Sequence, residues 1–322
     1  MRHFRIVALG ASLLALVLGA CTTGGGGQSP AATAGEPSAS LASTLKFGGP
    51  PECPDRPFCL IGLQETYGLE FEEFVPLDVG GPITVEALKN GEIDVALLFT
   101  SDPTIPAEDF VVLEDDKGLQ RADNLVPVVS QEFIDAAPAA EDVLNEVTSK
   151  ISQEELIALN EQVLAGDSPD VVAGGWLEGM GLAEGDAAIG EGVSLIVGST
   201  NFYEQEILAE VYAQALEANG FEVERRFQLG AREVVFPALQ AGELDLIVEY
   251  AATALEFVNE GAGEATADAA ETVELLNGHI AEDGLVALEP AAATDQNAIV
   301  VTRATADEFT LSAISDLAQP AP

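Results

Sequence analysis

The sequence predicts an α/β fold built as two lobes, and three observations lead to this fold class. After its first 43 residues, the chain of 322 residues is too long for one small core and suits two lobes of ordinary domain size. One pattern occurs twice, because residues 87–99 read ALKNGEIDVALLF and residues 238–250 read ALQAGELDLIVEY. Expected strands also alternate with expected helices, which implies parallel sheets flanked by helices. We therefore expect each lobe to contain one unit of helix, Gly-Glu turn and strand.

The N-terminal residues have the pattern of an export signal. A short basic stretch, MRHFR, precedes the apolar stretch IVALGASLLALVLGA, which is shorter than a membrane span. It ends in LGAC, which resembles a bacterial lipobox with Cys21 as the lipidated residue; the alternative is a plain secretory signal with a chance Cys. We expect a signal peptide at residues 1–20 and a flexible Gly/Ser/Pro tether at residues 21–43. The mature protein would then be lipid-anchored at the extracytoplasmic face of the cell membrane.

The remaining chain divides into strand and helix segments on both sides of a Gly-rich break, LAEGDAAIGEGVS, at residues 182–194. Before the break we expect strands at 44–48, 73–77, 93–99, 110–114 and 124–130, and helices at 60–67, 85–90, 141–149, 153–163 and 171–180. After it we expect strands at 195–198, 222–227, 244–249, 285–288 and 298–301, and helices at 204–219, 233–241 and 267–282. Short aliphatic runs such as IDVALLF and LDLIV fit strands buried on both faces. Open α/β sheets bind ligands beyond the carboxyl ends of their strands, so the ends at residues 99–102 and 250–253 would face an interlobe cleft.

The charge and the residue types exclude several classes of function. The net charge is -43, from 12 basic and 55 acidic side chains, so nucleic acid is not an expected partner. Histidine occurs only at His3 and His279, and no nucleophile elbow, phosphate loop or zinc motif is present. We therefore expect a binding protein and not an enzyme, with no cofactor and no metal site.

Two cysteines remain outside the signal, in the stretch CPDRPFC. An extracytoplasmic location is oxidising, so we expect a local disulfide between Cys53 and Cys59. The closed loop is short, and its entropic contribution is on the order of 2–3 kcal/mol or less. Its expected use is to fix the loop around Arg56.

A long ordered stretch resembles the substrate-binding proteins of ABC importers for glycine betaine, choline and other quaternary amines. Residues 198–205 resemble the opening Gly-Ser-x-x-Phe-x-Glu-Gln of that family, residues 229–233 its Leu-Gly-x-Arg-Glu, and residues 242–253 its Gly-Glu-Leu-Asp-x-x-x-Glu-Tyr-Thr-Gly-Thr. Upstream, RPFCLIGLQETYGLEF and GEIDVALLFTSDPTI resemble later portions of the family, as do DNLVPVV and LNEQVLAGDSPDVVAGGWLEGMGL. The resemblance covers residues 44–182 and 195–317, and it implies a two-lobed, type II periplasmic-binding-protein-like fold.

The order of these portions is reversed relative to the family, which we interpret as a circular permutation. The family's usual beginning falls at residue 195 and its usual end near residue 182, so residues 183–192 would be the permutation linker. Carried over from the family, lobe A would comprise residues 126–296, and lobe B residues 44–125 with 298–317. The alternatives are a fusion of fragments from tandem paralogues and swapped pairing between chains.

The resemblance also implies a ligand site between the lobes. Aromatic faces hold a quaternary ammonium by cation–π contact, at roughly 0.5–2 kcal/mol per ring. Tyr250 matches a position of the family's aromatic cage, Phe99 stands where the second lobe normally offers Tyr, and Asp123 and Asn297 replace two further cage tyrosines. Family pocket positions are also matched or adjoined by Asn201, Tyr203, Gln205 and Thr253. Arg56 lies in the disulfide loop, where the family has an Arg before its Gly-Leu run, and Asp102 follows the strand end at Phe99. Five of these residues have a structural alternative. It is core packing for Tyr250 and Phe99, a surface salt bridge for Arg56, and a helix cap or solvated carboxylate for Asp102 and Asp123.

The function that follows is capture of a small polar or cationic solute, of the glycine betaine or choline type or another, for delivery to an ABC permease in the membrane. The alternative is a ligand-sensing or scavenging lipoprotein that is not coupled to transport. We expect the protein to act as a monomer.

Overall fold

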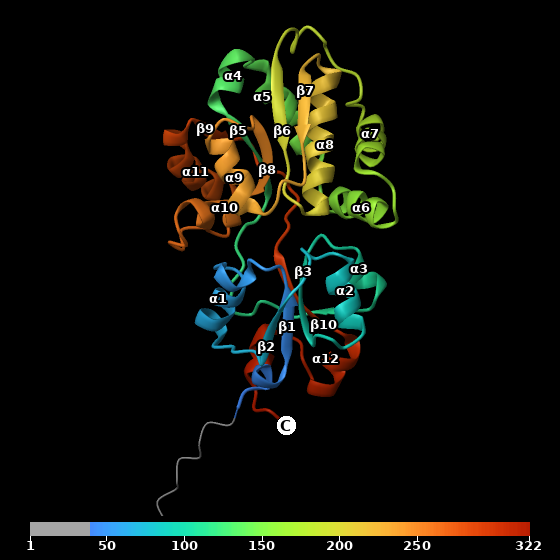
Figure 1. The fold of residues 1–322 in the computed structure, drawn as a ribbon, viewed down its shortest axis with the longest axis vertical. Coiled ribbons are helices and arrows are strands. Elements are labelled where there is room, and N and C mark those ends of the chain that lie inside the picture. The colour runs from blue at the N-terminus through green and yellow to red at the C-terminus, as the bar shows by residue number, and fades with distance from the viewer. Residues whose placement is uncertain (1–38) are drawn as a thin grey trace, which may run out of the picture. The chain divides into compact units, whose positions relative to one another are not determined.

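The computed structural model describes residues 39–322, which contain two five-stranded sheets (Figure 1). The expected signal peptide, the lipidation site Cys21 and most of the tether lie outside the described residues. Both sheets belong to one compact unit of the chain. We call the part around each sheet a lobe. The predicted α/β class with two lobes is confirmed.

Lobe B surrounds a sheet with the strand order β2-β1-β3-β10-β4. Its elements are β1 (Lys46–Gly49), α1 (Leu60–Gly62), β2 (Glu73–Pro76), α2 (Pro82–Lys89), β3 (Val95–Phe99), α3 (Thr104–Ala107), β4 (Val111–Val112), β10 (Asn297–Val301) and α12 (Arg303–Phe309). The expected helix at 60–67 is in fact α1 followed by a π-helical segment, Leu63–Tyr67.

Lobe A surrounds the second sheet, whose strand order is β7-β6-β8-β5-β9. Its elements are β5 (Leu125–Ser130), α4 (Gln131–Ala136), α5 (Ala139–Lys150), α6 (Gln153–Leu164), α7 (Pro169–Met180), β6 (Ser194–Gly198), α8 (Tyr203–Ala218), β7 (Glu222–Arg226), α9 (Arg232–Gln240), β8 (Leu246–Tyr250), α10 (Ala251–Val258), α11 (Ala269–Ile280) and β9 (Leu285–Ala287). Helices α9, α10 and α11 lie on one side of this sheet, and α7 and α8 on the other (Figure 1).

The central strands are buried on both faces, as their aliphatic runs predict. In β3, Val95 and Leu97 pack into one cluster of apolar side chains, whereas Ala96 and Leu98 pack into another. Strand β8 divides in the same way, with Ile247 on one side and Val248 on the other. Alternate side chains of a strand point to opposite faces, so each of these sheets has a core on both sides.

The expectation of parallel sheets is wrong for one interior strand of each sheet, next to the central strand. Strand β5 runs antiparallel to β8 and β9, and β10 runs antiparallel to β3 and β4. The reason is that the chain crosses between the lobes immediately before β5 and before β10. Each of these strands therefore starts at the end of the sheet where its neighbour finishes, with Leu125 opposite Tyr250 and Asn297 opposite Phe99.

The repeated sequence forms the same local structure in both lobes, in which α2 leads into β3 and α9 leads into β8. Gly91 and Gly242 follow the two helices with φ of 69° and 71°, a left-handed conformation that glycine adopts without steric cost. The aspartate three residues after each glycine also makes the same contact in both lobes, a hydrogen bond to a backbone N–H of the neighbouring strand. Asp94 Oδ2 accepts from Lys46 N, and Asp245 Oδ2 accepts from Ile196 N, both at 2.8 Å. The repeat thus joins each helix end to the parallel neighbouring strand, β1 in lobe B and β6 in lobe A, and places Phe99 and Tyr250 at the strand ends.

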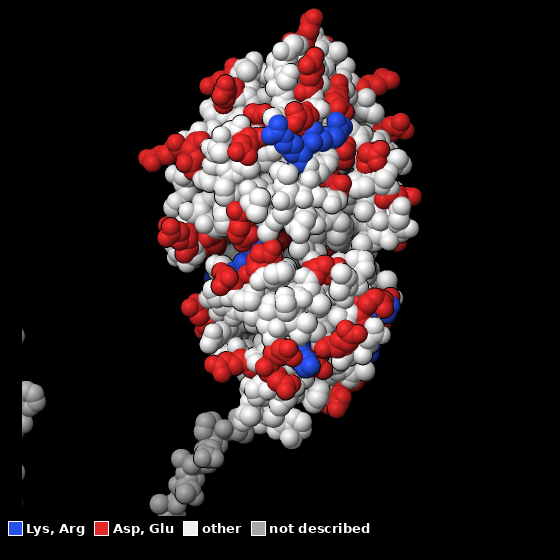
Figure 2. Space-filling model, in the orientation of Figure 1, with Lys and Arg blue, Asp and Glu red and all other residues white. Residues whose placement is uncertain are grey.

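The surface is acidic in both lobes. Figure 2 shows Asp and Glu spread over the visible face, with Lys and Arg at few positions. None of the helices within residues 39–322 combines the length and the apolar character that crossing a bilayer requires.

Candidate functional site

A cavity of about 560 Å³ lies between the two lobes, at the carboxyl ends of β3 and β8. Open α/β sheets place their ligands at this end of the strands. Further walls come from the start of α8, the start of α9, the loop closed by Cys53 and Cys59, and the two segments that cross between the lobes. A second hollow, of about 750 Å³, lies on the surface of lobe A, and its lining includes Arg225 and four acidic residues, Asp170, Glu206, Glu210 and Glu217. Arg225 is already paired with Glu210 and Glu217 in this hollow, so its charge is not free for a ligand. We therefore place the candidate site in the interlobe cavity.

Aromatic side chains reach this cavity from both lobes. The Phe99 ring of lobe B lies 4.7 Å, centroid to centroid, from the Phe202 ring that precedes α8 in lobe A. Gly80 passes against the Phe99 ring, where an added Cβ would lie 2.6 Å from a ring carbon. Tyr250 lines the same cavity at the end of β8 and is buried. The two rings singled out from the sequence, Phe99 and Tyr250, are thus brought to one cavity from opposite lobes.

The Tyr250 side chain is held by a buried carboxyl group. Its hydroxyl donates to Glu204 Oε1 at 2.6 Å, and Glu204 lies in the first turn of α8. The Asn160 amide of α6 donates to Glu204 Oε2. Burial raises the pKa of Tyr250 well above its ordinary value, and the negative charges of Glu204 and Asp295 add to this effect. Tyr250 therefore enters the cavity as a neutral ring with a fixed orientation.

Ser101 connects the lobes by bridging two carboxyl groups. Its Oγ lies 2.6 Å from Glu204 Oε2 in lobe A and 2.7 Å from Asp295 Oδ1. A hydroxyl has one proton and cannot donate to both oxygens, so one of the two carboxyl groups must itself carry a proton. Burial raises the pKa of Glu204 and of Asp295, and the charge of Glu204 raises the pKa of Asp295 further. Glu204 and Asp295 are therefore not ionised at the same time, and one of the two carboxyl groups keeps a proton.

The two crossing segments, residues 121–124 and 293–296, lie side by side at the cavity. Asn124 pairs with Thr294 in antiparallel register, and Asp295 N donates to Asp123 O at 3.0 Å. Asp123 therefore stands opposite Asp295, and both residues line the cavity. Asp123 Oδ1 accepts from Thr253 N at 2.9 Å. Burial raises the pKa of Asp123 to about 7, although the Thr253 bond and the charge of Arg232 act in the other direction.

Arg232 is a buried cation in the lining of the cavity, and it forms an ion pair with the carboxylate of Glu249. Its Nη2 lies 2.8 Å from Glu249 Oε2, and its Nε also donates to both oxygens of Glu249. The same Nη2 donates to Thr253 Oγ1 at 3.0 Å. This bidentate geometry is the strong form of an ion pair in proteins. Arg232 at the start of α9 is thereby tied to the end of β8 and the start of α10.

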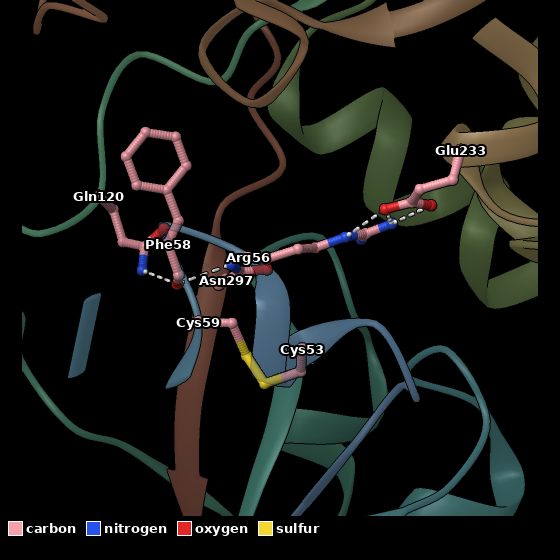
Figure 3. The surroundings of a disulfide bond; sticks show 7 residues. All are labelled: Cys53, Arg56, Phe58, Cys59, Gln120, Glu233 and Asn297. Carbon is pink, nitrogen blue, oxygen red and sulfur yellow. Dashed lines mark hydrogen bonds and ion pairs between the residues drawn. A yellow bond between two sulfur atoms is a disulfide. The ribbon is translucent and has the colours of Figure 1, made fainter. Parts of the chain in front are cut away.

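The loop closed by the disulfide, shown in Figure 3, lines the cavity from lobe B through Arg56, Pro57 and Phe58. Cys53 and Cys59 are joined, with their Cα atoms 5.2 Å apart. Arg56 points away from the disulfide, and its Nη2 lies 3.2 Å from both carboxylate oxygens of Glu233 in lobe A. The carbonyl of Phe58 accepts from the Gln120 amide at 3.0 Å and from the Asn297 amide at 2.9 Å. The loop is thus fixed to its own lobe while Arg56 reaches the other.

Eight of the ten ligand-site residues expected from the sequence line the cavity: Tyr250, Phe99, Thr253, Gln205, Asn201, Arg56, Asp123 and Asn297. Asp102 and Tyr203 do not line it. Asp102 is buried and its Oδ1 accepts from Thr104 N at 2.8 Å, as a cap of the turn that precedes α3. Tyr203 packs its ring against Phe202 at 4.8 Å, and its hydroxyl is sealed from solvent without a partner among the described residues.

The residues missed from the sequence are Phe202, Glu204, Arg232, Ser101 and Asp295. Phe202, Glu204 and Arg232 lie inside the recognised stretches, so their position next to Tyr203, Gln205 and Glu233 was an available signal. Ser101 precedes Asp102 directly. Asp295 offered no signal, because its role depends on the pairing of the two crossing segments.

Comparison with known proteins identifies similarity to one family. The model described as the substrate binding domain of ABC-type glycine betaine transport systems matches residues 32–179 and 193–322. The carnitine transport binding protein OpuCC of Listeria monocytogenes is 31% identical over 96 residues, which are 30% of this chain and 30% of that protein. The ergothioneine transport permease/ergothioneine binding protein EgtU of Helicobacter pylori is 31% identical over 142 residues, 44% of this chain and 25% of that protein.

A third relative is the glycine betaine-binding protein YehZ of Escherichia coli, which is 30% identical over 126 residues, 38% of this chain and 41% of that protein. The chain thus matches less than half the length of each of these relatives. All three names describe binding proteins for small solutes.

Proposed function

The chain belongs to the family of substrate binding domains of ABC-type glycine betaine transport systems, and from this premise we propose that it is the extracytoplasmic solute-binding component of an ABC importer. The observation that carries the proposal is the interlobe cavity of about 560 Å³, which is lined by Phe99 from one lobe and by Phe202 and Tyr250 from the other. A pocket of this size with aromatic walls and a few fixed polar groups suits a small solute.

Solute capture works by closure of the lobes on the ligand. The two crossing segments act as hinges, since they alone connect the two sheets within residues 39–322. Closure brings Arg56 to Glu233 and Ser101 to Glu204, so these contacts hold the lobes together around the bound solute. The closed protein then docks on a membrane permease, which opens the lobes and takes up the solute.

The solute class follows from the walls of the cavity. Organic cations bind to aromatic faces, and the rings of Tyr250 and Phe99 line the cavity from the two lobes. The related proteins are named for carnitine, glycine betaine and ergothioneine. We assign to this chain a small polar or cationic solute, with ligand contacts from the eight cavity residues that the sequence singled out.

The chain order of the lobes supports a circular permutation. Leu41 N donates to Gln319 O at 2.7 Å and Ala321 N to Ala39 O at 2.8 Å, so residues 39–41 lie beside residues 319–321. A direct connection between these segments would restore the usual family order. The family match is interrupted at residues 180–192, which contain the proposed linker 183–192. We further propose that Cys21 is lipidated and that residues 21–43 tether the protein to the membrane.

A solute screen tests the proposed function. Purified protein is heated with carnitine, glycine betaine, choline, ergothioneine, ectoine and amino acids, and thermal stabilisation is recorded for the wild type and for Phe99→Ala. A binding component is expected to melt at a higher temperature with at least one solute, by ligand linkage, and to lose that shift in the variant. If every solute leaves the melting temperature unchanged, or if Phe99→Ala keeps the full shift, the proposed site is wrong.

A further inference from the structure

The cavity has a strong excess of carboxyl groups. Eight acidic residues line it: Glu52, Asp55, Glu65, Asp123, Glu233, Glu256, Glu260 and Asp295. The lining contains two arginines, and protein carboxylates already hold both, Arg56 through Glu233 and Arg232 through Glu249. A ligand carboxylate would therefore find no guanidinium free to receive it. The electrostatics of the cavity favour a solute with net positive charge.

Three members of this set are almost fully buried, namely Asp123, Asp295 and Glu256. The Glu256 carboxylate accepts from the backbone of Gly263 and Ala265, which leaves the two aspartates. They stand opposite each other on the antiparallel crossing segments, a position in which side chains start from Cβ atoms about 4.5–5.5 Å apart. Each residue is only 4% exposed. Like charges at directly opposite positions repel each other, so this pair is unfavourable to the fold unless a proton or a cation lies between them.

Both aspartates keep one oxygen without a donor among residues 39–322. Asp123 uses Oδ1 for Thr253, and Asp295 uses Oδ1 for Ser101. Neither Oδ2 atom is among the partnerless polar atoms that are sealed in the described part of the protein. Each Oδ2 atom therefore keeps some accessible surface, and because both residues line the cavity we infer that this surface faces it. The floor of the cavity thus has two hydrogen-bond acceptors, Asp123 Oδ2 and Asp295 Oδ2, and no donor among residues 39–322 bonds to them.

Aromatic surface lies beside this acidic floor. Tyr250 is paired with Leu125, two residues after Asp123, and the Phe99 and Phe202 rings face the same cavity. Aromatic faces contact the carbon skeleton of an organic solute and attract its charge. This combination fits an organic cation better than a bare inorganic ion.

We propose that the cavity selects a small organic cation that carries N–H groups, such as a protonated amine, amidine or guanidine, and that this group donates to Asp123 and Asp295 at the cavity floor. The inference rests on the proposed function, because it names the solute class of the same site. A fully methylated ammonium has no N–H to donate and would leave both carboxylate oxygens without a hydrogen bond. Charge-assisted hydrogen bonds of this kind change an affinity by about tenfold or more.

Matched solutes separate the two ammonium classes in a calorimetric titration. Ethanolamine and choline differ only in the methylation of nitrogen, as do glycine and glycine betaine, whereas agmatine and putrescine extend the N–H class to longer cations. We expect the wild type to bind ethanolamine, or one of its longer analogues, about tenfold or more tightly than choline. We also expect each carboxylate-bearing solute to bind more weakly than its alcohol counterpart.

Isosteric variants assign the preference to the two aspartates. Asp123→Asn and Asp295→Asn each remove a charge and keep an acceptor oxygen, and Glu282→Gln removes one charge at an exposed position outside the cavity. The preference for the N–H cation should fall about tenfold or more in each aspartate variant and persist in Glu282→Gln. Circular dichroism shows whether each aspartate variant is folded. If one of them does not fold, the other still tests the inference.

The outcomes distinguish this inference from the proposed function. Tighter binding of choline or glycine betaine than of every N–H cation would overturn the inference and leave a solute-binding component in place. A preference that survives in both aspartate variants would also overturn it. Binding of none of these solutes would count against both.

Discussion

Phe99 and Phe202 meet across the two lobes, with their ring centroids 4.7 Å apart and their planes inclined by 40°. Phe99 ends the strand of the repeated unit in lobe B, and Phe202 precedes the helix α8 of lobe A. The contact is therefore one of the points at which the lobes close over the cavity. It lies beside Ser101, whose hydroxyl reaches Glu204 at the start of the same helix.

A double-mutant cycle measures this contact. We expect Phe99→Leu and Phe202→Leu to be coupled by about 0.5–1.5 kcal/mol in the free energy of unfolding, the usual contribution of an aromatic pair beyond its buried area. Urea unfolding of the wild type, both single variants and the double variant gives this value. A coupling energy of zero would mean that the rings do not meet in solution.

The Asp123 carboxyl makes stability depend on pH. Burial raises its pKa to about 7 in the folded protein, from an ordinary 3.8. The folded state therefore holds the proton more tightly than the unfolded chain, and the stability that this group contributes is lost as pH rises from about 4 to about 7. Relative to Asp123→Asn, which does not titrate, the wild type should become less stable over this range and then level off. The neighbouring charges of Arg232, Glu249 and Asp295 are common to both proteins.

Thermal melts of the two proteins from about pH 4 to about pH 8 check this sign. Glu282→Gln serves as the control with an equal change in net charge. A constant difference between wild type and Asp123→Asn at every pH would show that the carboxyl is not perturbed. For the same reason, affinity for a cationic solute should increase as pH rises through about 7, because the ionised form of Asp123 binds it.

The disulfide is expected to support binding more than folding. It closes a loop whose ends are only 6 positions apart, so its reduction should lower the free energy of unfolding by about 2–3 kcal/mol or less. Affinity should fall as well, since the loop carries Arg56 and the carbonyl of Phe58 that holds Asn297. Mass spectrometry of the non-reduced protein should find no free thiol at Cys53 or Cys59. Two free thiols there would remove the disulfide from the account.

Much of the fold follows from patterns that are local in the sequence. The repeat around Asp94 and Asp245 predicted both helix–turn–strand units, because glycine conformation and strand burial depend on neighbours along the chain. The strand ends at Phe99 and Tyr250 followed from the same units. Helix α10 was missed because it begins at Ala251, directly after a strand, with no turn residue between them.

The polar part of the site could not be predicted in the same way. Ser101 meets Asp295 across 194 positions, and that contact depends on how the crossing segments pair. The strand direction of β5 and β10 depends on the same crossing, which explains why the parallel expectation failed there. The sequence points to Asp123 as a replaced cage residue, whereas its opposite partner Asp295 can be identified only from the three-dimensional structure.

Calorimetric titration of Tyr250→Ala tests the central claim, which is that a solute binds between the lobes at the ends of β3 and β8. The titrant is the solute that stabilises the wild type most, and Tyr250→Phe, which keeps the ring and loses the hydroxyl bond to Glu204, is the matched comparison. The account predicts that Tyr250→Ala weakens binding by about tenfold or more while Tyr250→Phe keeps more of the affinity. Unchanged affinity in a folded Tyr250→Ala protein would contradict it.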